Sequence, residues 1–122
     1  MSPSEEEVFT TWTSELAGWN ASVVFVCGEL DASTVPRFVS DMREVIRTGR
    51  HVIMDAHLLS YIDSTGVSAL VSASNALRSG GRRMCLVGCH GLVSKVIRIT
   101  RVDCELGIFE DIDGALAAMG QG

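Results

Sequence analysis

The chain has 122 residues, of which 47% are hydrophobic, 20% are charged and only two are proline. This composition is typical of one folded domain with a hydrophobic core, and it excludes wholesale disorder. The formal net charge is −5, which argues against nucleic acid as a partner, because the phosphate backbone requires a basic surface.

The N-terminal sequence sets our expectations for domain limits and location. Residues 1–7 include three consecutive glutamates, and we expect a flexible acidic tail there, followed by a single domain over residues 8–120. No apolar run approaches the roughly 20 residues that cross a bilayer, and the acidic start lacks the apolar stretch of a secretory signal. We therefore expect a cytoplasmic protein with no membrane partner. The cysteines that we expect to stay reduced there are Cys27, Cys85, Cys89 and Cys104.

Two strands and a helix are predicted in the first part of the chain. Residues 8–13 and 22–27 are rich in β-branched and aromatic side chains, and turn residues around Gly18 separate them as in a hairpin. Helix-capping residue types and Pro36 then open a segment whose apolar residues recur every three or four positions. This spacing predicts an amphipathic helix that ends near Gly49.

Strands and helices alternate through the rest of the chain. Short apolar strands are predicted over residues 51–55, 84–89 and 106–109, and residues 58–62 lead from the first strand to a helix that begins at 63–66 and ends at Gly80-Gly81. Two further helices are predicted over residues 92–99 and 112–119. The order β-β-α-β-α-β-α-β-α indicates an α/β fold with a mixed, mostly parallel sheet flanked by about four α-helices.

No residue set typical of catalysis or of cofactor binding is present. Ser64 lacks the first glycine of the G-x-S-x-G motif, and neither glycine motif for nucleotide binding occurs. The histidines have no motif context, and Cys85, Cys89 and His90 lack the second ligand pair of a metal site. We interpret these cysteines as small core residues. We therefore predict that the protein is not an enzyme and holds no metal or cofactor.

The segment Asp63-Ser64-Thr65-Gly66 joins a strand to the start of a helix. One interpretation is helix capping, in which Asp63 or Ser64 accepts hydrogen bonds from the free amides of the first turn. The other is a phosphorylatable serine. A phosphate at a helix N-terminus meets free N–H groups and the positive end of the macrodipole, so the modified domain would stay folded while its surface changed sign.

Two motifs give the chain a family resemblance. Gly28-Glu29-Leu30-Asp31 follows one strand, and Val52-Ile53-Met54-Asp55 leads through Leu58, Tyr61 and Ile62 to Asp63-Ser64-Thr65-Gly66-Val67. Together they resemble the STAS domain of bacterial anti-sigma factor antagonists, and the predicted element order matches that fold along nearly the whole chain. Ala56-His57 and Tyr61 depart mildly from the family pattern. The resemblance places the family's phosphoserine on Ser64, with Thr65 as the alternative acceptor.

The resemblance implies a partner-switching mechanism. An anti-sigma factor, itself an ATP-dependent serine kinase, would hold a sigma factor until the unphosphorylated antagonist displaces it. Phosphorylation of Ser64 would end that interaction, and a serine phosphatase of the PPM type would restore it. The residues that we expect to form the docking surface are Gly28, Glu29, Asp31, Ser33, Asp63, Ser64, Thr65, Gly66 and Val67.

Simpler structural roles and other functions also fit these residues. Asp31 is suited to capping the first helix, and Gly66 to close backbone packing at the start of the second. The basic run from Arg78 to Arg101 is typical of a solvated face, although Lys95, Arg98 and Arg101 share one side of the third predicted helix and suit an acidic partner. The alternative functions are a STAS adaptor subunit of a transporter or stress-sensing scaffold, without a phosphoserine switch, and a small hydrolase that uses Ser64.

Overall fold

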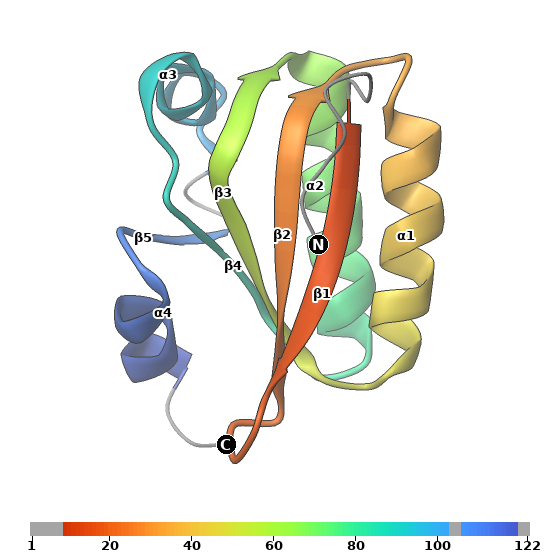
Figure 1. Cartoon of the computed structure of the whole chain (residues 1–122), viewed down its shortest axis with the longest axis vertical. Coiled ribbons are helices and arrows are strands. Elements are labelled where there is room, and N and C mark those ends of the chain that lie inside the picture. The colour runs from red at the N-terminus through yellow and green to blue at the C-terminus, as the bar shows by residue number, and fades with distance from the viewer. Residues whose placement is uncertain (1–8, 103–105, 120–122) are drawn as a thin grey trace.

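The computed structural model describes residues 9–102 and 106–119, which form five strands and four helices (Figure 1). The type and order of these elements confirm the sequence prediction. Two expectations, the acidic tail over residues 1–7 and the state of Cys104, lie outside the described residues. The elements are β1 (Phe9–Leu16), β2 (Ala21–Leu30), α1 (Val35–Arg47), β3 (His51–Ile62), α2 (Ser64–Ser79), β4 (Met84–Val87), α3 (Gly91–Ile99), β5 (Gly107–Phe109) and α4 (Ile112–Met119).

The five strands form one sheet in the order β1-β2-β3-β4-β5. β1 pairs antiparallel with β2 through a tight turn in which Gly18 and Asn20 have φ values of 85° and 50°. The remaining neighbours are parallel, because each pair is joined by a crossover through a helix. The mixed, mostly parallel sheet that the sequence predicts is confirmed.

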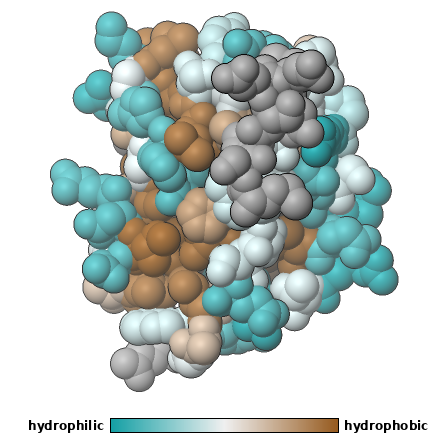
Figure 2. All heavy atoms as spheres, in the orientation of Figure 1, coloured by the Kyte–Doolittle hydropathy of each residue, from teal (hydrophilic) through white to brown (hydrophobic). Residues whose placement is uncertain are grey.

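The sheet separates two hydrophobic clusters. On one face, α1, α2 and α3 bury residues such as Phe38, Leu70 and Ile97 against the strands. On the other face, α4 contributes Ala115 and Leu116 to a smaller cluster. Figure 1 shows α4 to the left of the strands, α1 to their right and α2 behind β1 and β2, and Figure 2 shows hydrophobic residues at the surface beside α4. The three-helix face therefore holds the main core.

β3 is longer than predicted, and its pairing with β2 shifts register at two points, the first of them at Asp55. The sequence predicts a strand over 51–55 and a separate lead into α2, whereas β3 continues to Ile62. Phe25 is opposite Asp55 and Cys27 is opposite Leu58, so β3 has one extra residue at this point. The amide of His57 donates to the Asp55 carboxylate at 3.0 Å. A β-bulge thus interrupts the apolar alternation without ending the strand.

Smaller differences occur at two other strand ends. β1 extends to Leu16, beyond the predicted end at residue 13, because the polar residues there still pair with β2. β4 ends at Val87, so Cys89 lies after the strand and not within it. Gly88 follows β4 with a φ of 76°, a conformation that glycine adopts at little cost and that turns the chain out of the sheet.

Candidate functional site

The β2–α1 turn and the β3–α2 junction lie side by side at the carboxyl ends of two neighbouring parallel strands. Leu30 and Ile62, the last residues of β2 and β3, are directly paired. Both segments that the sequence motifs mark therefore leave the sheet at the same edge, where open α/β proteins commonly place their functional residues. The structure brings the predicted site residues, from 28 to 33 and from 63 to 67, together at this edge.

Asp63 is the N-cap of α2. Its backbone is extended (φ −118°, ψ −173°), and its side chain accepts a hydrogen bond from the amide of Gly66. The distance from the Gly66 nitrogen to Asp63 Oδ1 is 3.1 Å. Of the two capping candidates that the sequence offers, Asp63 takes the role and Ser64 does not.

Ser64 and Thr65 are exposed in the first turn of α2. Within the described residues, no side-chain hydrogen bond involves the hydroxyl of either one. The Ser64 hydroxyl is therefore accessible to another protein, and it lies at the positive end of a helix of 16 residues. Neighbouring Val67 is only 7% exposed, so its side chain belongs mainly to the core.

Gly66 lets the start of α2 pack closely against the end of β2. A Cβ atom at this position would lie 2.5 Å from the Leu30 carbonyl oxygen and 2.7 Å from Ile62 Cγ1. No side chain fits in that space, because real Cβ contacts are longer. The prediction that Gly66 permits close backbone packing at the helix start is confirmed, and its partner is the end of β2.

Asp31 organises the β2–α1 turn. Its Oδ1 accepts from the amide and the hydroxyl of Ser33, at 2.9 and 2.7 Å, and from the amide of Thr34 at 3.3 Å. The Ser33 hydroxyl is the main reason why the pKa of Asp31 lies below its ordinary value of 3.8, with the two amides adding to the effect. The turn thus carries an ionised, partly exposed carboxylate at physiological pH.

The N-cap residue of α1 is Thr34, so the interpretation of Asp31 as the helix cap is wrong. The Thr34 hydroxyl accepts from the Asp31 amide at 3.0 Å and donates to the Glu29 carbonyl at 2.8 Å. Asp31 lies one turn earlier and satisfies amides that precede the helix. Gly28 lies inside β2, just before a register shift against β3, and has a φ of 106°, where glycine is strongly favoured.

Two exposed hydrophobic residues next to the site were not predicted as part of it. Leu58 and Tyr61 on β3 are 42% and 37% exposed, and Tyr61 pairs with Glu29 near the end of β2. Both belong to the family motif, but Leu58 follows the bulge at Asp55 and His57, and Tyr61 follows a second register shift between Leu59 and Tyr61. The sequence did hold one signal for Tyr61. It immediately precedes Ile62, and because neighbouring side chains of a strand point to opposite faces, a buried Ile62 implies an outward Tyr61.

The histidines and cysteines do not form a second site. His57 Nδ1 lies 2.6 Å from Asp55 Oδ1, and His90 Nε2 lies 2.8 Å from the His57 carbonyl oxygen. Among the residues that the structure describes, no histidine is hydrogen-bonded to Ser64, no disulfide includes Cys27, Cys85 or Cys89, and no group of three potential ligands could hold a metal ion.

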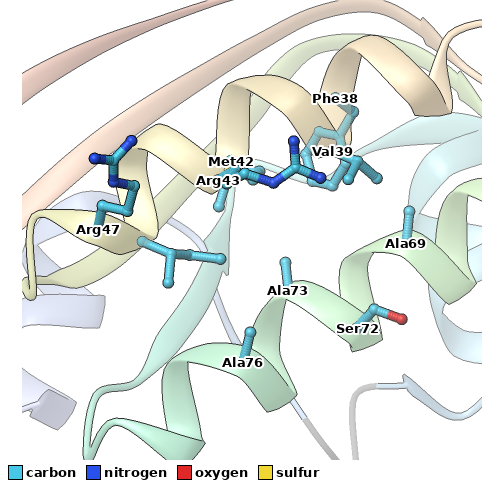
Figure 3. Close-up of a pocket in the computed structure, with 10 residues that line it drawn as sticks. Phe38, Val39, Met42, Arg43, Arg47, Ala69, Ser72, Ala73 and Ala76 are labelled. Atoms are coloured by element: carbon cyan, nitrogen blue, oxygen red, sulfur yellow. The ribbon is translucent and has the colours of Figure 1, made fainter.

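A hollow of about 310 Å³ separates α1 from α2 (Figure 3). Phe38 and Met42 of α1 face Ala69, Ala73 and Ala76 of α2 across it, and the small alanine side chains leave the space open. None of the predicted site residues lines this hollow. The candidate site is therefore an exposed edge suited to a protein partner and not a small-molecule pocket.

Comparison with known proteins identifies the family. A family model for the STAS domain matches residues 18–115, and the chain belongs to this family. It is 33% identical over 79 residues to an anti-sigma-B factor antagonist of Listeria monocytogenes, covering 63% of this chain and 68% of that protein.

Two solved structures show the same fold. An anti-sigma factor antagonist from Mycobacterium paratuberculosis superposes with a TM-score of 0.81 at 23% identity, covering 90% of this chain and 92% of the other. The antagonist SpoIIAA in its unphosphorylated form gives a TM-score of 0.70 at 21% identity, covering 92% and 96%. In the described part of our chain, no helix has the length and apolar character of a membrane span.

Proposed function

We propose that this STAS domain is an anti-sigma factor antagonist controlled by phosphorylation of Ser64. Its unphosphorylated form binds an anti-sigma factor, which is an ATP-dependent serine kinase, and so releases the sigma factor in the cytoplasm. Relatives named anti-sigma-B factor antagonists support the general function. The observation that carries the switch is the exposed Ser64 hydroxyl, which makes no hydrogen bond within the described residues because Asp63 caps the helix.

The position of Ser64 explains how a phosphate would act. At the first residue of α2, the dianion would meet free backbone N–H groups and the positive end of the helix dipole, so the fold would tolerate it. A partner docked at this edge would have to desolvate about two negative charges. Phosphorylation would therefore weaken docking while leaving the antagonist folded.

The protein itself would act by binding, without turnover. A serine nucleophile needs an adjacent base, and within the described residues no histidine bonds to Ser64. Mg²⁺ and ATP would belong to the kinase, and a PPM-type serine phosphatase would regenerate the active form. Thr65 remains the alternative acceptor, since it is also exposed in the first turn.

The first experiment incubates the purified chain with ATP, Mg²⁺ and each anti-sigma kinase encoded in its own genome. Intact mass followed by peptide mapping should show one added phosphate on Ser64. Isothermal titration should then give tight kinase binding for Ser64→Ala and at least tenfold weaker binding for Ser64→Asp. Ser40→Asp is the matched control, because it adds one charge to an exposed position of α1, outside the predicted docking residues.

Each alternative predicts a different result. Equal kinase affinity for Ser64→Ala and Ser64→Asp would refute the phosphoserine switch. A phosphate mapped to Thr65 would show that Thr65, and not Ser64, is the acceptor. If no kinase binds or modifies the chain, and it instead co-purifies with a transporter or a sensory scaffold, the adaptor function holds. In that case Ser64 has no regulatory role.

A further inference from the structure

Arg101 has a backbone conformation that its residue type disfavours. Its φ is 60°, and among the described non-glycine residues only Asn20 shares a positive value. Asparagine tolerates the left-handed region through its short polar side chain, whereas arginine gains no such compensation. Arg101 immediately follows Thr100, the C-cap of α3, at the position where helices most often place glycine.

The left-handed backbone at Arg101 reverses the chain after α3, but this reversal does not require an arginine side chain. The Arg101 amide donates to the Arg98 carbonyl at 3.2 Å, and the chain reversal buries Val102, which is 4% exposed, in the main core. A glycine would make the same reversal at lower conformational cost. The turn itself therefore gives no reason for an arginine at this position.

Arg101 lies beside α2 and not with the other bases of the third helix. The sequence places Lys95, Arg98 and Arg101 on one helix side, and this prediction is wrong because α3 ends at Ile99. Lys95 and Arg98 line a hollow at the start of α3. Arg101 instead lines a separate hollow of about 350 Å³ against α2.

The hollow beside Arg101 continues the face of α2 on which Ser64 lies. Its α2 side is formed by Val67, Ser68, Val71 and Ser72. Positions 64, 68 and 72 are four residues apart, and side chains with this spacing follow one another along a helix. A partner that covers Ser64 and extends along α2 would therefore meet the exposed Arg101 side chain.

We infer that Arg101 binds an acidic side chain of the docked anti-sigma factor. This inference rests on the proposed function and adds a second contact to the Ser64 edge. Within the described residues no carboxylate forms an ion pair with Arg101, so its planar guanidinium can present parallel N–H groups to a carboxylate. The site also gives a chain of net charge −5 a local attraction for an acidic partner.

The test compares Arg101→Gly and Arg101→Lys with Arg43→Ala, which removes the same charge from an exposed position on α1. We expect Arg101→Gly to melt no lower than the wild-type chain, yet to bind the anti-sigma factor at least tenfold more weakly and with a smaller dependence on salt. Arg101→Lys should be intermediate and Arg43→Ala unchanged. Binding by Arg101→Gly within twofold of wild type would overturn the inference, and so would equal weakening by Arg43→Ala.

A second measurement separates this inference from the proposed function. A ¹⁵N-labelled sample is titrated with a hexaglutamate peptide at low salt, and we expect shifts of the Arg101 Nε–H and of the Ser68 and Ser72 amides that Arg101→Gly abolishes. If these shifts occur but no anti-sigma factor binds the chain, the acid-binding site stands and the proposed function fails. Absence of the shifts overturns the site.

Discussion

Gly66 in α2 packs directly against Leu30 at the end of β2: a Cβ atom at position 66 would lie 2.5 Å from the Leu30 carbonyl oxygen. This contact joins the two segments of the candidate site, because Leu30 is the last residue of β2 and Gly66 lies in the first turn of α2. The relative position of Asp31 and Ser64 therefore depends on a glycine that itself offers no side chain to a partner.

Gly66→Ala should destabilise the protein, although alanine favours helices more than glycine by about 1 kcal/mol. The added methyl group meets a backbone carbonyl and the Ile62 side chain. Overpacking of this kind costs up to about 3 kcal/mol, so the expected net loss is up to about 2 kcal/mol. Urea unfolding measures the difference. Gly80→Ala is the control, since its nearest neighbour would lie 3.6 Å away; equal losses in both variants would contradict the packing argument.

Asp63→Ala should lower the free energy of unfolding by about 1 kcal/mol, because it removes the N-cap hydrogen bond to the Gly66 amide. Ser64→Ala should change it by less than about 0.5 kcal/mol, as expected of a surface residue without such a contact. Asp63→Asn, which retains an acceptor oxygen, should recover most of the loss. A Ser64→Ala loss as large as that of Asp63→Ala would show that the serine hydroxyl caps the helix.

The sequence predicts local elements well where one periodicity continues, as in α1, whose buried Phe38, Met42 and Val45 follow helical spacing. It fails where a tertiary contact decides. The bulge at Asp55 and His57 keeps β3 intact, although the apolar alternation stops there. Likewise, the predicted helix end at residue 99 is confirmed, but helical spacing gives no sign of the left-handed backbone at Arg101 or of the burial of Val102.

The candidate site shows the same division. The motifs identify both segments, and parallel pairing of β2 with β3 brings them together. The sequence does not predict which side chain caps α2, because Asp63 and Ser64 are both good N-cap residues. Only the backbone geometry of the junction selects Asp63. The same holds for the outward orientation of Tyr61, which follows from the register of β3.

Ser33→Ala should raise the pKa of Asp31 toward its ordinary value, because the Ser33 hydroxyl is the largest cause of the lowered pKa. A carboxylate with a lowered pKa stabilises the folded state above about pH 4, and this contribution is lost as pH falls through the folded-state pKa. The stability difference between wild type and Ser33→Ala should therefore shrink below about pH 4.

Carbon-detected NMR titration of the Asp31 carboxyl group measures this pKa directly. Ser60→Ala is the matched control, since the Ser60 hydroxyl donates to the Gly28 carbonyl, at 3.1 Å, and not to Asp31. We expect its Asp31 midpoint to equal that of the wild type. A midpoint in Ser33→Ala that does not move would refute the assignment of the lowered pKa to the Ser33 hydroxyl.

Cys89 should resist alkylation in the folded protein. Burial, reinforced by the charge of Asp55, raises the pKa of this thiol to about 11, and the thiolate is the reactive form. At pH 8, iodoacetamide should therefore modify Cys89 much more slowly in the folded chain than in urea, as peptide mass spectrometry would show.

The raised pKa of Cys89 also affects stability. Because it favours the neutral thiol, its contribution to the free energy of unfolding is present below pH 9 and declines toward about pH 11. Cys89→Ala should lack this decline, and modification of Cys89 at the unfolded rate would contradict the burial that raises its pKa.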